Sequence, residues 1–208
     1  MLPANVCVID LGVANYGSMV NMLKKVGSRA VLSSRVSDIE AATHIILPGV
    51  GSFDAVSKAL FAKPDAVAAL QNQVIDKQIP FMGVCVGMQL LFSKSEEGIE
   101  PGLGWIEGDV RRFENDSSEQ KLLIPHMGWN IAKPLMESPI FEIEEQYKFY
   151  FVHSFRATNV PLANKLCITN YGGEFVSAVK RENIYGFQFH PEKSHKYGIN
   201  LFSKFIGL

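Results

Sequence analysis

The chain has 208 residues, a formal net charge of -1, 47% hydrophobic residues and 20% charged residues. This is the composition of an ordinary globular protein and predicts one packed domain over residues 1–208, while the near-neutral charge disfavours binding to nucleic acid or anionic lipid. No apolar run is long enough to predict a membrane span, and the N-terminal segment lacks the features of a signal peptide.

The first half alternates short β-branched apolar runs with helical patterns, which predicts βαβ units and a mainly parallel sheet. The predicted strands span residues 6–10, 30–33, 44–47 and 80–84. The predicted helices between and after them span residues 18–26, 52–61, 66–77 and 88–94. This half should therefore be an α/β layer structure.

The second half changes character after Ser95, because Gly98, Pro101, Gly102 and Gly104 disfavour a long helix. Strands are predicted at residues 148–155, 166–169, 175–180 and 184–189. They follow one another through turns, which predicts a meander rather than further βαβ units. Apolar residues at helical spacing predict a last helix over residues 196–205 that packs back on the sheet.

Cys85 lies between Gly83 and Gly87, where an apolar strand gives way to a helical pattern. Such an elbow exposes a nucleophile at the start of a helix, whose N-terminus stabilises a thiolate. The alternative is that Cys85 is a small buried apolar residue. With Cys7 and Cys167, the chain has only three widely spaced cysteines, which disfavours a disulfide framework and favours a reducing, cytoplasmic setting.

His190 and Glu192 flank Pro191 at the end of a predicted strand. A thiolate nucleophile needs an acid/base to protonate the leaving amine, and that base needs a group to orient it. Glu192 can turn back to the His190 imidazole. A lone histidine here would more often be structural, but its combination with Cys85 favours catalysis.

The segment from Leu47 to Ser52 follows a strand and precedes a helix. Its glycines could let backbone N–H groups around Gly49 and Val50 face an oxyanion near Cys85. The alternative is a plain strand-to-helix turn. The segment lacks the lysine of a phosphate-binding loop.

Together these three segments resemble the class I, triad-type glutamine amidotransferases. The resemblance implies a flavodoxin-like, open, mainly parallel sheet with flanking helices and added antiparallel strands in the second half. It implies Cys85 as the nucleophile that forms a glutamyl thioester, His190 as acid/base and Glu192 as its orienting group. It also implies Gly49 and Val50 at the oxyanion and the following contacts with glutamine: Gly51, Gly87, Gln89, Ser154 and Phe155.

Residues 125–130, 150–154 and 190–194 further resemble the glutaminase subunits of imidazole glycerol phosphate synthases. That resemblance implies a heterodimer in which a (β/α)8-barrel synthase subunit receives the ammonia, with Asn15, Trp129 and Lys193 facing this partner. The residues themselves predict no metal, because no zinc-type cluster of ligands appears, and no cofactor is expected. Without the resemblance, Trp129 could be a core residue and Lys193 a solvated surface charge.

Three other readings stay open from the residues. A paralogous glutaminase could supply ammonia for amination of a surface-polysaccharide sugar, with the same triad. A flavodoxin-like binding module would contain Cys85 only as a buried residue. A cysteine peptidase could use a Cys-His-Glu triad on another acyl group.

Overall fold

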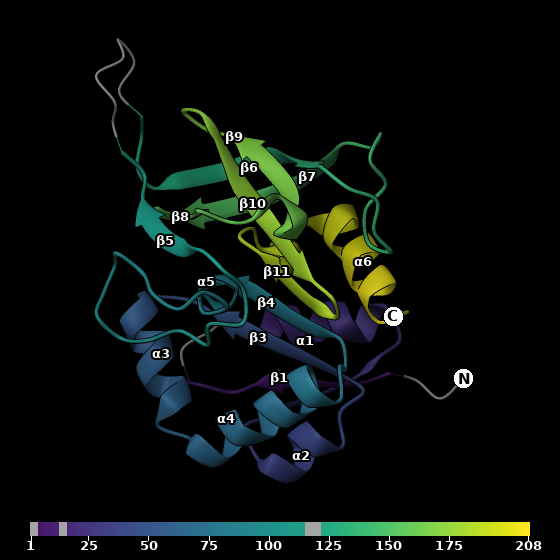
Figure 1. The fold of residues 1–208 in the computed structure, drawn as a ribbon. Helices are drawn as coiled ribbons and strands as arrows, with labels where there is room; N and C mark the ends of the chain where they lie inside the picture. The colour runs from purple at the N-terminus through teal and green to yellow at the C-terminus, as the bar shows by residue number, and fades with distance from the viewer. Residues whose placement is uncertain (1–3, 13–15, 115–121) are drawn as a thin grey trace.

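The computed structural model describes residues 4–12, 16–114 and 122–208. These residues form one mixed sheet of eleven strands with helices on both faces (Figure 1). Among the described helices, none has the length and apolar character to cross a membrane.

The first part of the sheet is parallel and has the strand order β2-β1-β3-β4-β11. This is the 2-1-3-4-5 order of flavodoxin-like folds, so the predicted fold class is confirmed. Parallel strands buried on both faces are continuous apolar runs, as the sequence of β3 and β4 illustrates. The strands are β1 (Asn5–Ile9), β2 (Arg29–Ser33), β3 (His44–Gly49), β4 (Phe81–Cys85) and β11 (Ile184–Phe187).

The helices lie in two groups on opposite sides of this parallel part (Figure 1). One group packs α1 against α6, and the other packs α4 against α2 and α3. The short helix α2 was missed from the sequence. The bounds are α1 (Tyr16–Lys25), α2 (Val36–Glu40), α3 (Phe53–Phe61), α4 (Pro64–Gln71) and α6 (His195–Phe205).

The second part of the sheet is antiparallel and extends it in the order β10-β9-β6-β7, with β8 pairing both β10 and β5. The prediction missed β5 and β6. Its single strand over residues 148–155 is wrong, because the chain bends at Ser154 and changes partner from β6 to β5. The bounds are β5 (Asp109–Arg112), β6 (His126–Pro134), β7 (Tyr147–His153), β8 (Phe155–Thr158), β9 (Lys165–Asn170) and β10 (Glu174–Arg181), with the short helix η2 (Leu162–Asn164) before β9.

The predicted helix over residues 88–94 is also wrong, because helix α5 covers only Val86–Gln89. The carbonyls beyond it bind backbone N–H groups of the following loop instead of later turns of a helix. Leu103 N–H donates to Leu90 O at 2.7 Å, and Ile106 N–H donates to Leu91 O at 3.0 Å. The helix predicted over 66–77 ends as α4 at Gln71 and continues as a π-helical turn, η1 (Asn72–Asp76).

The core runs through both parts of the sheet and is rich in phenylalanine. Phe149 and Phe189 stack at 3.9 Å between ring centroids where the antiparallel part meets the chain after β11. This packing fixes the ends of β4, β7 and β11 relative to one another.

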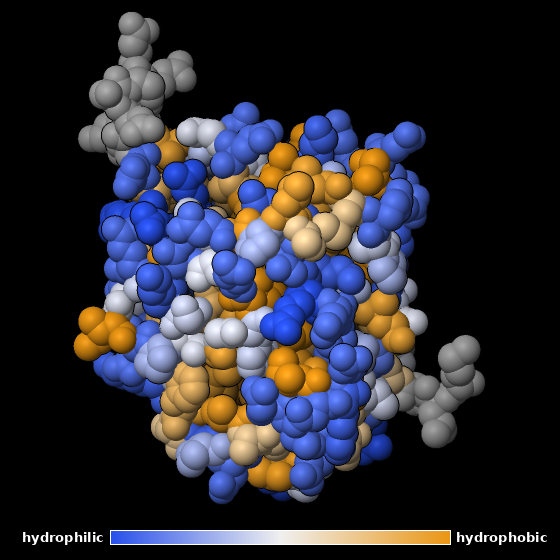
Figure 2. All heavy atoms as spheres, viewed as in Figure 1, coloured by the Kyte–Doolittle hydropathy of each residue, from blue (hydrophilic) through white to orange (hydrophobic). Residues whose placement is uncertain are grey.

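The face of the molecule in Figure 2 is mostly hydrophilic, with separate apolar patches.

Candidate active site

Cys85 is the last residue of β4 and has a positive φ of 56°, and α5 begins at the next residue. This conformation is strained for a residue with a side chain and is typical of functional positions. The turn needs its two glycines: a Cβ added at Gly87 would collide with the Leu47 carbonyl oxygen, and one at Gly83 would collide with the Gly87 backbone. The tight packing of α5 against β3 therefore holds the nucleophile elbow.

His190 reaches Cys85 because β11 lies beside β4 in parallel register, with Phe187 opposite Val84. The C-terminal ends of parallel neighbours meet at one edge of the sheet, so the residues just beyond both strands are close. Gln188 Nε2 donates to the Cys85 sulfur at 3.9 Å. The short helix η3 (Pro191–Lys193) follows, and the His190 Nδ1–H donates to Glu192 Oε1 at 2.7 Å.

The turn that carries His190 is tied to β7 by backbone and hydroxyl contacts. His190 N–H donates to Tyr150 O at 2.8 Å. The fully buried Ser194 hydroxyl donates to His190 O at 2.6 Å and accepts from Tyr150 N–H at 3.0 Å. The imidazole is therefore held from its backbone as well as from Glu192.

Burial lowers the pKa of His190, but the interaction with Cys85 and its charge, followed by Glu192, outweigh burial and raise this pKa to about 10. Nε2 of His190 is buried and has no hydrogen-bond partner among the described residues. An imidazolium beside sulfur stabilises a thiolate, and the same group can then deliver its proton to a leaving nitrogen. The arrangement suits nucleophilic acyl transfer.

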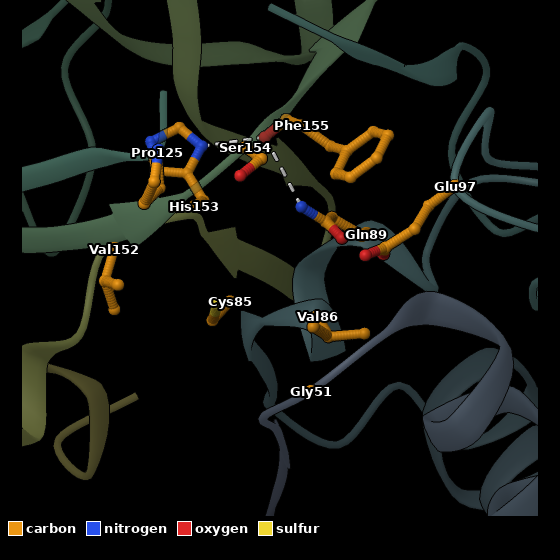
Figure 3. Close-up of a pocket in the computed structure, with 10 residues that line it drawn as sticks. All are labelled: Gly51, Cys85, Val86, Gln89, Glu97, Pro125, Val152, His153, Ser154 and Phe155. Atoms are coloured by element: carbon orange, nitrogen blue, oxygen red, sulfur yellow. Dashed lines mark hydrogen bonds between the residues drawn. The ribbon is translucent and has the colours of Figure 1, made fainter. Parts of the chain in front are cut away.

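A cavity of about 250 Å³ opens next to Cys85. This is just below the usual volume range of ligand pockets and fits a substrate of amino-acid size. Figure 3 shows Cys85 and Val86 on one side of it and the His153–Phe155 segment on the other. The residues that line the cavity are Gly51, Cys85, Val86, Gln89, Glu97, Pro125, Val152, His153, Ser154 and Phe155.

Four of the five predicted glutamine contacts line this cavity, and Gly87 does not. Gly87 instead lies under β3 as part of the elbow. Of the predicted oxyanion residues, Gly49 is paired with Cys85 in the β3–β4 register, and Val50 follows it with 45% of its surface exposed.

Of the predicted partner-facing residues, Trp129 and Lys193 are exposed. The Lys193 ammonium lies 5.9 Å from the centre of the Tyr150 ring, and Trp129 stacks on His195 at 5.6 Å. Asn15 lies outside the described residues. Among the residues that are described, no cluster of three or more His, Cys, Asp or Glu side chains is placed to hold a metal ion.

Sequence reasoning missed Val86, Glu97 and His153. The Val86 N–H directly follows the nucleophile, the position that supplies an oxyanion donor in nucleophile elbows, so the elbow pattern itself could have identified it. Glu97 comes from the glycine-rich loop after α5, and its Oε2 accepts from Phe53 N–H at 2.8 Å. No local signal marks Glu97 or His153.

His153 is buried in the cavity wall beside a second buried histidine, His126. His126 Nδ1 lies 3.0 Å from His153 Nε2, and His153 Nδ1 lies 2.7 Å from Phe155 O. Burial lowers the pKa of His126 to about 4 and, as the largest of several influences, that of His153 to about 3. Both imidazoles are therefore neutral at pH 7.

These two histidines should make the fold acid-sensitive. In the unfolded chain they take up protons near pH 6.5, so the stability that they contribute is present above that pH and is lost as the pH falls towards 4. Each histidine lowers the free energy of unfolding by up to about 1.4 kcal/mol per pH unit in this window. Urea titrations at pH 7, 6 and 5 should show this slope, and His126→Phe should remove roughly one histidine's share of it. An unchanged slope in His126→Phe would contradict the assignment.

Comparison with known proteins supports the same chemistry. The family Glutamine amidotransferase class-I matches residues 7–207. The imidazole glycerol phosphate synthase subunit HisH 2 of Pseudomonas aeruginosa is 50% identical over 204 residues, covering 98% of this chain and 99% of the relative. The corresponding subunit HisH of Leptospira borgpetersenii is 42% identical over 202 residues, covering 97% and 98%.

Two solved structures share the fold. PurLQS from Thermotoga maritima has a TM-score of 0.75 at 20% identity, covering 100% of this chain and 99% of that chain. A structure described as a glutamine amidotransferase has a TM-score of 0.72 at 18% identity, covering 98% and 99%. At these identities the likeness concerns the fold alone.

Proposed function

Because this chain belongs to the glutamine amidotransferase class-I family, we propose that Cys85, His190 and Glu192 are the triad with which it hydrolyses glutamine to glutamate and ammonia. One observation carries the proposal: a strained elbow thiol and a buried His–Glu pair meet beside a cavity of amino-acid size. Neither the binding-module reading nor the peptidase reading accounts for both this geometry and the family match.

In the first half-reaction, the Cys85 sulfur attacks the side-chain carboxamide carbon of glutamine and a C–S bond forms. The carbonyl electrons move to oxygen, and the resulting oxyanion is stabilised by the Val86 N–H with donors around Gly49 and Val50. Collapse of this intermediate breaks the C–N bond while His190 protonates the leaving nitrogen. Ammonia departs and a glutamyl thioester remains.

In the second half-reaction, water attacks the thioester. His190, now neutral, takes the proton from the water, and the C–S bond breaks to release glutamate and regenerate the thiolate. Glu192 keeps the Nδ1–H of His190 directed to itself, so that Nε2 faces the reacting atoms in both steps.

We assign recognition of the substrate's α-ammonium group to Glu97 and Gln89. In Figure 3 both side chains lie on the side of the cavity opposite Val152. One carboxylate oxygen of Glu97 accepts from Phe53 N–H, and Gln89 Oε1 is buried without a hydrogen-bond partner among the described residues. A buried acceptor without a partner is costly unless a ligand supplies the donor. An ammonium group supplies three.

Glu97→Gln should therefore weaken glutamine binding more than chemistry. We expect KM for glutamine to rise by about tenfold or more, with kcat changed by less than about threefold, because the contact is present in both ground and transition states. Steady-state kinetics of glutamate release measures both constants. Glu96→Gln, in the same loop but not lining the cavity, is the matched control. A fall in kcat at unchanged KM would contradict the assignment.

The relatives' common name supports the role of glutaminase subunit of an imidazole glycerol phosphate synthase in histidine biosynthesis, working with a partner subunit. We propose that the partner is a (β/α)8-barrel synthase that contacts Trp129, Lys193 and Asn15. It would use the ammonia to form imidazole glycerol phosphate and an aminoimidazole carboxamide ribotide.

We further propose that residues 1–208 act as one domain, because a single core includes residues from Val6 to Phe205. We place this domain in the cytoplasm, because a free thiol nucleophile suits a reducing compartment.

The test is glutamate release from glutamine by the chain alone, with the barrel subunit, and with the barrel subunit and its nucleotide ligand. We expect strong turnover only in the last case. Ammonia that is released into water is protonated and is no longer a nucleophile, so glutamine hydrolysed without a bound acceptor would be wasted. Equal turnover in all three would contradict the coupling. Growth of the organism without histidine after deletion of the gene would favour the sugar-aminating paralogue.

A further inference from the structure

A series of hydrogen bonds, buried at its centre and partly buried at both ends, joins strand β6 to the wall of the cavity. Asn130 Nδ2 lies 3.2 Å from His126 Nε2, His126 Nδ1 lies 3.0 Å from His153 Nε2, and His153 Nδ1 lies 2.7 Å from Phe155 O. Both histidines are more than nine-tenths buried. None of the steps proposed above uses His126 or Asn130.

The groups at the two ends of this series, Phe155 O and the Asn130 amide, determine which ring nitrogens of His126 and His153 carry a hydrogen. Phe155 O can only accept, so His153 Nδ1 carries a hydrogen and its Nε2 accepts from His126 Nδ1–H. Nε2 of His126 must then accept from the Asn130 amide. That amide is itself oriented, because its Nδ2 donates to Asn170 O at 3.0 Å and its Oδ1 accepts from Ile131 N–H at 2.8 Å.

The series continues from Phe155 O to the nucleophile. Gln89 Nε2 donates to Phe155 O at 3.5 Å and to Gln188 Oε1 at 3.1 Å, and Gln188 donates to the Cys85 sulfur. Figure 3 shows Phe155 O between His153 and Gln89, with a hydrogen bond to each. One carbonyl thus connects the histidine pair with the side chains around the sulfur.

The histidine pair also has little freedom to move. The His126 ring is stacked between Phe151 and Tyr171, at 4.7 Å and 4.0 Å between centroids. Trp129 and Ile131, which flank Asn130 in β6, are 42% and 41% exposed. A protein that binds this exposed side of β6 would therefore contact the strand that carries Asn130 and His126.

We propose that His126 and His153 are positioning residues that hold the Ser154–Phe155 wall and the Gln89 amide in the geometry that binds glutamine, and that Asn130 links this geometry to the exposed side of β6. The proposal rests on the proposed function of the same site. It assigns no chemical step to either imidazole.

Two substitutions of His126 separate hydrogen bonding from packing. His126→Phe keeps an aromatic ring between Phe151 and Tyr171 but removes both ring nitrogens. His126→Asn loses the stacking but places an amide N–H where Nδ1–H was, so it can still donate to His153. His44→Phe is the matched control, because His44 is a buried histidine at the opposite end of β3 from Gly49.

Kinetics are measured on the complete two-subunit enzyme, with thermal unfolding of each variant. We expect His126→Phe to raise KM for glutamine about tenfold with kcat changed by less than about threefold. His126→Asn should restore KM despite its lower stability, and His44→Phe should leave KM unchanged. A normal KM in His126→Phe, or equal KM values in both His126 variants, would overturn the proposal.

The rate at which iodoacetamide alkylates Cys85 separates this proposal from the proposed function, because it needs no glutamine turnover. We expect a change of about threefold or more in His126→Phe and recovery in His126→Asn. If the wild-type enzyme turned over no glutamine but the alkylation rates behaved in this way, the proposed function would fall, and only the positioning of the wall beside Cys85 would stand. Active enzyme with unchanged KM and alkylation in His126→Phe would overturn the positioning role alone.

Discussion

Cys85→Ala is expected to lower glutamine hydrolysis by about 10⁴-fold or more, because it removes the atom that forms the thioester. The loss should be confined to the glutamine reaction. In the two-subunit enzyme supplied with an ammonium salt instead of glutamine, product formation should persist if, as we propose, the acceptor chemistry belongs to the partner. Glutamate release and ammonium-dependent synthesis, measured on one preparation, check both parts.

Cys167→Ala is the matched control for this variant. Cys167 is fully buried in β9, and burial raises the pKa of its thiol well above the ordinary value. The pKa of Cys7 is likewise raised to about 12 by burial and by Asp38. A glutamine-analogue electrophile should therefore label one thiol per chain, at Cys85. Glutamine turnover that survived Cys85→Ala would rule out the thioester mechanism.

His190→Ala should lower kcat for glutamine hydrolysis by about 10²- to 10⁴-fold, because both half-reactions need a proton moved at the same position. Its effect on KM should be small, since His190 is not among the residues that line the cavity. His190→Ala also removes the imidazolium beside the Cys85 sulfur, so alkylation of Cys85 should slow in the same variant. Rapid-quench measurement of the thioester distinguishes slow formation from slow hydrolysis.

His44→Ala is the control for His190→Ala, because it also removes a buried imidazole. His44 lies at the end of β3 that is opposite Gly49. It should lower stability and leave kcat within about twofold. If His190→Ala kept more than a tenth of the wild-type kcat, another group would have to move the proton, and the assignment of His190 would be wrong.

Local patterns were sufficient to predict strands β1 to β4 of the parallel part and to propose the triad. The glycine at Gly83 is a local requirement, because a Cβ there would collide with the Gly87 backbone; Gly87 itself is required by its close approach to Leu47 O in the neighbouring strand β3. His190 and Glu192 lie within one turn, so their contact also depends on neighbouring residues alone. The triad's catalytic roles remain a prediction that the kinetics above will test.

The remaining parts of the site depend on contacts between distant segments. The helix expected after Met88 ends early because loop residues Leu103 and Ile106 occupy the carbonyls that would have continued it. Glu97 enters the cavity through the same loop.

The sequence by itself predicted alternating strands and helices in the first half, from their periodicity, and the contact of His190 with Glu192, from a short turn. Only the tertiary structure decided that β11 lies beside β4, which brings Gln188 and His190 to Cys85. It likewise decided that the pairing of β6 with β7 places His126 against His153. Strand pairing is a long-range choice made by the whole core, and no local pattern in either strand specifies its neighbour.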